Sequence, residues 1–140
     1  MNKILIFASL LLLFACKENT IPKENLKYLN GYWEISEVSF PDGTKKNYKI
    51  NPTIDFIQWD NNEGFRKKLQ PKFDGTYNTS HDMELLHVSQ VDASFILRYS
   101  NEFDDWEETL VHLDSMSFSV RNDEGISYSY KRFQPISIPK

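Results

Sequence analysis

Short runs of alternating apolar and polar residues, each ended by turn residues, fill the sequence from Gly31 onward. No stretch there has a helical period of useful length. The expected strands are residues 31–40, 53–59, 65–70, 73–79, 83–89, 93–100, 106–113, 115–121 and 126–133. Eight or nine short strands in about a hundred residues are typical of an all-β sandwich or barrel.

The last two expected strands show which side chains face the core. Phe118 and Val120 alternate with serines, and Tyr128, Tyr130 and Arg132 share one face of the next strand. Successive side chains of a strand point to opposite faces. We therefore expect Arg132 to point inward together with the two tyrosines.

The first strand changes phase, because Trp33 and Ile35 stand at odd positions whereas Val38 and Phe40 stand at even ones. One extra residue near Ser36-Glu37 predicts a β-bulge, as a strand needs when it serves both sides of a small barrel. The run at 53–59 changes phase in the same way, after Phe56.

The N-terminus predicts export and lipid attachment. Residues 1–15 combine one lysine with an apolar run of twelve residues, too short to span a bilayer and suited to a signal peptide. The run ends in Leu13-Phe14-Ala15-Cys16, which resembles the lipobox of bacterial lipoproteins. The single cysteine of the chain is then the lipidated first residue of the mature protein.

Residues 16–27 are expected to hold the lipidated Cys16 and a flexible tether, because they are polar and contain Pro22. The predicted location is the cell envelope, as a lipoprotein of the outer membrane that faces the periplasm or the cell surface. The residues Lys17-Glu18 after the cysteine do not decide between these two faces.

Composition limits the rest of the chain to one domain with an apolar core. Removal of residues 1–15 leaves 125 residues, and loss of Lys3 shifts the formal charge from −4 to −5. A strongly basic face is missing, so nucleic acid is not an expected partner. All three Trp, all seven Tyr and eight of the ten Phe remain to fill the core.

Gly31-Tyr32-Trp33 opens the first strand, and the inward Arg132 lies on the last one. A guanidinium that faces a core needs a partner, and an indole ring offers one. Lipocalins and their relatives share this Gly-x-Trp and Arg pair, which the sequence resembles. The resemblance implies that Gly31, Trp33 and Arg132 close one end of the barrel.

The mature chain is similar to the small lipocalin-like (calycin-type) lipoproteins of Bacteroidetes. Further residues carry this likeness: Leu29-Asn30, Pro41-Asp42-Gly43-Thr44, Lys72 to Tyr77, Trp106-Glu107-Glu108 and Tyr130 to Phe133. It implies an antiparallel up-and-down β-barrel of about eight strands over residues 28–134, with a tail at 135–140. The chain is shorter than the well-studied lipocalins and lacks room for their C-terminal helix.

Barrels of this kind often hold a small apolar ligand, whereas an eight-stranded barrel can also fill itself with side chains. The many large aromatic residues favour a filled or nearly filled interior. Any ligand is expected to enter opposite Trp33 and Arg132. The side chains expected to line the interior are Ile35, Phe56, Leu97, Tyr99, Phe118, Tyr128 and Tyr130.

No catalytic, metal or cofactor site is expected, and the protein is not predicted to be an enzyme. Glu107 and Glu108 are neighbours on one strand and point to opposite faces, so they cannot act as an acid/base pair. The three histidines have no spacing typical of a metal pair.

Two charged stretches, Arg66-Lys67-Lys68 and Asp104 to Glu108, are expected to be solvated strand faces. Two functions remain open. The first is a lipid-anchored barrel that binds a small hydrophobic ligand. The second is a filled barrel that docks an envelope protein as an inhibitor or accessory module, and an exposed apolar patch would favour it.

Overall fold

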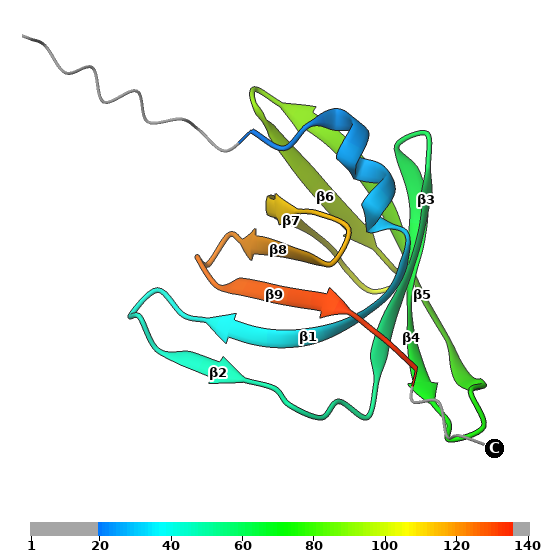
Figure 1. Ribbon diagram of the computed structural model, residues 1–140. Coiled ribbons are helices and arrows are strands. Elements are labelled where there is room, and N and C mark those ends of the chain that lie inside the picture. Colours follow the sequence, from blue (N-terminus) through cyan, green and yellow to red (C-terminus); the bar gives the residue numbers. More distant parts are fainter. Residues whose placement is uncertain (1–19, 136–140) are drawn as a thin grey trace, which may run out of the picture.

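The computed structural model describes residues 20–135 (Figure 1). The predicted signal peptide, the predicted lipidation site Cys16 and most of the predicted tail lie outside these residues. The elements in chain order are a 3-10 helix η1 (Lys23–Leu29) and nine strands. The strands are β1 (Gly31–Ser39), β2 (Lys45–Asn47), β3 (Ile54–Asp60), β4 (Glu63–Pro71), β5 (Tyr77–Val91), β6 (Ser94–Ser100), β7 (Asp105–Leu113), β8 (Ser117–Asn122) and β9 (Ser127–Arg132).

The strands form a closed antiparallel barrel, which confirms the predicted fold class. Neighbours in the chain pair from β3 through to β9, and β1 closes the sheet by pairing with both β3 and β9. The short β2 pairs only with the end of β1, so the barrel itself has eight strands. Closure leaves no long unpaired edge.

The predicted bulge in the first strand is confirmed. The register between β1 and β9 shifts between Ile35 and Glu37. As a result Trp33 is fully buried before the shift and Val38 is 6% exposed after it. The bulge lets one strand keep an apolar inner face while it bends from β3 toward β2.

The second expected phase change, in residues 53–59, is wrong. β3 pairs with β4 in one continuous register from Ile54 opposite Leu69 to Asp60 opposite Glu63. Its turn explains why: Asn61 and Asn62 both have positive φ, 49° and 69°, as in the two-residue turn that best matches strand twist. The adjacent apolar pair Phe56 and Ile57 therefore covers both faces of one regular strand.

The expected separate strands 73–79 and 83–89 are parts of one strand, β5, of 15 residues. The turn before it runs from Lys72 to Thr76. Asp74 accepts hydrogen bonds from the backbone and hydroxyl of Thr76, and Gly75 has φ 83°. These residues form the turn, and β5 begins only at Tyr77.

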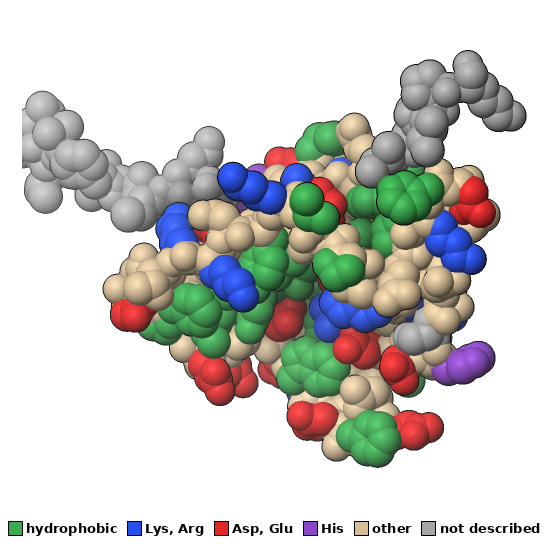
Figure 2. All heavy atoms as spheres, turned by 90° about the horizontal axis from the view of Figure 1, so that it is seen from below, with side chains coloured by type: hydrophobic (Ala, Val, Ile, Leu, Met, Phe, Trp, Pro, Cys, Tyr) green, Lys and Arg blue, Asp and Glu red, His purple; other side chains and the backbone are tan. Residues whose placement is uncertain are grey.

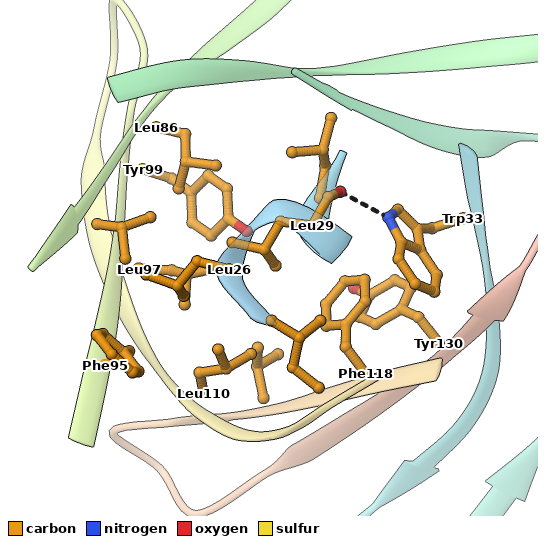
Figure 3. Packing of buried hydrophobic residues seen from close by; sticks show 14 residues of the cluster. Leu26, Leu29, Trp33, Leu86, Phe95, Leu97, Tyr99, Leu110, Phe118 and Tyr130 are labelled. Carbon is orange, nitrogen blue, oxygen red and sulfur yellow. Dashed lines mark hydrogen bonds between the residues drawn. The ribbon is translucent and has the colours of Figure 1, made fainter. Parts of the chain in front are cut away.

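The helix η1 includes residues 23–27, which were expected to belong to a flexible tether. Leu26 and Leu29 are 1% and 0% exposed and point into the barrel (Figure 3). The Asn25 side chain donates to the Leu113 carbonyl, and the Trp33 indole donates to the Leu29 carbonyl at 2.8 Å. Seven residues are too few to show a helical period, so the sequence pattern gave no sign of this element.

The core fills the half of the barrel that lies under η1. Trp33 meets Phe118 edge to face at 4.7 Å, and Phe118 stacks on Tyr130 at 4.6 Å. The cluster consists of Leu26, Leu29, Trp33, Ile57, Leu86, Val88, Phe95, Leu97, Tyr99, Leu110, Leu113, Phe118, Val120 and Tyr130. We call the end of the barrel at η1 the closed end and the opposite end the open end.

Replacement of Leu29 by Ala should lower the free energy of unfolding by about 2–5 kcal/mol, because it leaves a cavity in a filled core. The matched change Lys23→Ala, at an exposed position of the same helix, should have little effect. Urea denaturation of both variants measures the difference. A small effect at Leu29 would mean that η1 does not hold the closed end.

Candidate functional site

The closed end is held by Arg132, whose guanidinium lies 3.6 Å from the centre of the Trp33 ring. Its three nitrogens donate to the backbone carbonyls of Tyr28, Asn30 and Ser115, at 2.9, 2.7 and 3.1 Å. Trp33 and Arg132 are direct partners across β1 and β9. The predicted stacking is therefore present, and the same side chain also fixes the chain between η1 and β1.

Gly31 makes this arrangement possible. Its φ is +119°, and a Cβ at this position would lie 2.6 Å from the Arg132 Nη1. An L side chain would therefore suffer both backbone strain and a clash.

The open end holds a cavity of about 400 Å³. β1 pairs with β3 only through Gly31–Trp33 and then turns toward β2, so the two strands separate. Trp33, Ile35 and Tyr130 form the inner wall of the cavity, and residues 50–53 cover it. Asp55 and Lys68 lie at its side as an ion pair of 2.5 Å.

The structure brings only part of the predicted ligand-binding set to this cavity. Ile35 and Tyr130 line it, and Tyr128 lines a second cavity at the open end. Leu97, Tyr99 and Phe118 are packed in the core.

Phe56, which was expected inside the barrel, lies instead on its outer face. There it packs against the rings of Tyr32, at 4.9 Å, and Phe65, at 6.0 Å. The regular register of β3 turns Asp55 and Ile57 inward in its place.

Arg66 shows that the basic stretch is not a solvated face throughout, contrary to expectation. It is 9% exposed, stacks on the Tyr99 ring at 4.0 Å and donates from Nε to Glu84 at 2.5 Å. Arg66 is the cross-strand partner of both Ile57 and Glu84. The two-residue turn at Asn61-Asn62 fixes that register, and it was the sequence signal that could have placed Arg66 inside.

The acidic stretch is not a solvated face throughout either, because its neighbouring residues divide between the two faces of β7, as the alternation predicts. Glu107 points outward and forms an ion pair with Arg98, whereas Glu108 is only 8% exposed. Among the described residues, none hydrogen-bonds to the buried Oε2 of Glu108 or to the buried hydroxyl of Tyr99. Burial raises the pKa of Glu108, and the nearby Arg66 offsets part of this rise. Burial likewise raises the pKa of Tyr99.

A groove of about 240 Å³ lies outside the barrel, near the 71–77 turn. Ile50 and Phe73, which are 90% and 83% exposed, stand beside it, and Tyr77, Phe133 and Pro135 also line it. Figure 2 views the molecule from below and shows apolar side chains gathered on this face, with charged side chains between them.

Within residues 20–135, no three His, Cys, Asp or Glu side chains gather in a way that could hold a metal ion. No helix of this part of the chain is long and apolar enough to cross a membrane.

The closed antiparallel barrel, with a tryptophan and a stacked arginine at one end, defines the class of this protein as a lipocalin-like barrel. No protein-family model and no curated protein matches the sequence.

Two solved structures resemble the chain at low sequence identity. A lipocalin-like protein from Bacteroides uniformis is 13% identical, with a TM-score of 0.49 and coverage of 76% of this chain and 99% of that chain. Lobster apocrustacyanin A1 is 14% identical, with a TM-score of 0.46 and coverage of 81% and 66%. The class itself rests on the strand order and the closed end described above.

Replacement of Arg132 by Ala should lower the free energy of unfolding by about 2–4 kcal/mol, because it removes three hydrogen bonds and the stack on Trp33. Arg121→Ala, on the exposed face of β8, should change it by less than about 0.5 kcal/mol. Thermal and urea denaturation measure both. Equal effects of the two substitutions would show that Arg132 contributes no more than a surface arginine.

Proposed function

We propose that this protein is a lipid-anchored barrel of the bacterial cell envelope that binds a small hydrophobic molecule in its open half. The cavity of about 400 Å³ beside Trp33, Ile35 and Tyr130 is the observation that carries the proposal. It joins an apolar inner wall to a few polar groups, as small-molecule sites usually do.

The filled closed half limits the size of the ligand. Leu26 and Leu29 of η1 occupy the space that a long apolar chain would need. A cavity of about 400 Å³ is near the lower end of the usual range for ligand sites. The ligand is therefore a compact apolar molecule, and the Asp55–Lys68 pair offers partners for a polar group at one side of it.

Lipid attachment at Cys16 rests on the lipobox Leu13-Phe14-Ala15-Cys16. The described chain begins beside η1, which lies at the closed end (Figure 1). An anchor placed a few residues earlier would hold the closed end toward the membrane and leave the open end accessible. The outer membrane is the proposed location. Protease accessibility in intact cells distinguishes its cell surface from its periplasmic face.

The second candidate is a protein-interaction module, and the outer groove favours it. Ile50 and Phe73 present large apolar side chains to solvent beside a groove that an apolar side chain of a partner protein would fit. This groove shares Ile50, Asn51 and Pro52 with the interior cavity. Phe73 lines only the groove and Ile35 only the cavity, so variants at these two positions can assign an observed binding event to one of the two.

Replacement of Cys16 by Ala should abolish incorporation of labelled fatty acid and release the protein from the membrane fraction, because the thiol is the proposed attachment point. Metabolic labelling and fractionation of cells measure both. Labelling that persists in the Cys16→Ala variant would overturn the lipobox assignment.

Native mass spectrometry of residues 17–140, mixed with an envelope lipid extract, should show a bound small molecule of defined mass. The Ile35→Trp variant should reduce the bound fraction at least about tenfold, because the indole fills the cavity. Val111→Trp, at an exposed position on β7, should leave it unchanged.

A bare mass in the unmodified protein would contradict ligand binding. A bound mass lost in Phe73→Ser but kept in Ile35→Trp would assign the molecule to the outer groove. Thermal denaturation of each variant confirms that it is folded before its binding is compared.

A further inference from the structure

Within residues 20–135 no side chain forms an ion pair with Glu108, and its buried Oε2 accepts no hydrogen bond. The charges of Arg66 and Lys68 act on this carboxylate, but each of these cations already pairs with another acid. Arg66 binds Glu84 and Lys68 binds Asp55, both at 2.5 Å. Within each of these two ion pairs the positive and negative charges neutralise each other. The nearly buried carboxylate of Glu108 is left without a paired charge.

Glu108 lines a cavity of about 340 Å³ at the open end, between the start of β7 and the β8–β9 turn. Two of the lining residues are aromatic, Trp106 and Tyr128. Trp106 is held in place by stacking on Tyr99, with the ring centres 5.7 Å apart. The cavity is thus a pocket with aromatic walls and a buried acid in one side.

The charged side chains that line this cavity are all acidic. Glu107 is neutralised by Arg98, but Asp123 and Glu124 are exposed at the turn and form no ion pair within the described chain. The side-chain oxygen of Asn122 is already used, because it accepts hydrogen bonds from the backbone N–H groups of Glu124 and Ile126. The electrostatic potential at the cavity therefore favours a positive charge.

An unpaired carboxylate in a nearly buried position is costly, and either a proton or a cation can relieve that cost. Aromatic faces attract cations as well, most strongly where water is excluded. We propose that this second cavity binds a small organic cation, an alkyl- or arylammonium, with its charge between Glu108 and the rings of Trp106 and Tyr128.

The chemistry of the cavity favours an ammonium over a metal ion. Calcium takes six to eight oxygen ligands, and magnesium also requires several at short distances. The described chain gathers no three groups suited to that task. Two aromatic walls instead suit an organic cation, whose carbon atoms also gain from apolar contact.

This inference goes beyond the proposed function, since it concerns a different cavity and a ligand of defined charge. The volume of about 340 Å³ suits a molecule with one ring or a short chain. Phenethylammonium is therefore a suitable probe, and 2-phenylethanol is its neutral match of nearly equal shape.

Isothermal titration calorimetry of residues 17–140 at neutral pH tests the proposal. Phenethylammonium should bind with a submillimolar Kd, and 2-phenylethanol should bind at least about tenfold more weakly because it lacks the charge. Similar affinities for the two probes would overturn the proposal, as would no binding of phenethylammonium. Calcium binding that displaces the ammonium would assign the site to a metal ion and overturn it as well.

A pair of variants separates the site from surface charge. Glu108→Gln should weaken phenethylammonium binding at least about tenfold, whereas Glu102→Gln removes the same charge at an exposed position outside the cavity lining and should change it less than about twofold. Equal losses in the two variants would show that only general surface charge attracts the probe.

The two ligand hypotheses can fail separately. Ile35→Trp blocks the larger cavity and should leave ammonium binding within about twofold of the unmodified protein. Ammonium binding in this variant, together with a bare mass of the unmodified protein after the lipid extract, would support the cation site and reject the proposed hydrophobic ligand. A molecule from the lipid extract bound to the unmodified protein, without any binding of the ammonium, would reject the cation site alone.

Discussion

The contact of Arg132 with Trp33 is the interaction on which the remaining structure depends. One guanidinium covers the indole face and ties together η1, the start of β1 and the turn before β8 through three backbone carbonyls. Hydrogen bonds from a charged donor are stronger than neutral ones. Barrel closure between β1 and β9 and the seating of η1 are therefore one event, and Gly31 is needed because any side chain there would occupy the space of Arg132.

That closure divides the interior into two unlike halves. Under η1 the barrel is solid, and Leu26 and Leu29 replace whatever a deeper cavity could have held. At the open end β1 stops pairing with β3 and pairs with β2 instead. The polar residues Asp55 and Lys68 line the cavity in the gap that this leaves. Buried ion pairs such as Arg66–Glu84 seldom add net stability, because desolvation offsets their attraction.

The sequence was sufficient for the features that depend on alternation over several residues. It predicted the strand-rich barrel, the bulge at Ser36-Glu37 and the inward Arg132. Each of these features shows in the sequence as apolar residues that recur at every second position, or as a shift of that pattern by one residue. It failed where the pattern was too short or ambiguous. η1 has only two buried apolar residues, and the doublet Phe56-Ile57 suggested a bend although both faces of β3 are covered. Arg66 was missed because a basic triplet looks solvated unless the turn at Asn61-Asn62 is used to set its register.

Glu108 connects the local chemistry of the open end to the question of what enters it. The same alternation that sends Glu107 outward to Arg98 forces Glu108 inward, opposite Leu97. A glutamine or leucine there would avoid the cost of a desolvated acid, which the charge of Arg66 offsets only in part. Stability alone does not explain the residue. A charge that is unfavourable in the empty barrel and favourable beside a bound cation would make ligand charge, and not only ligand size, a basis for selection at the open end.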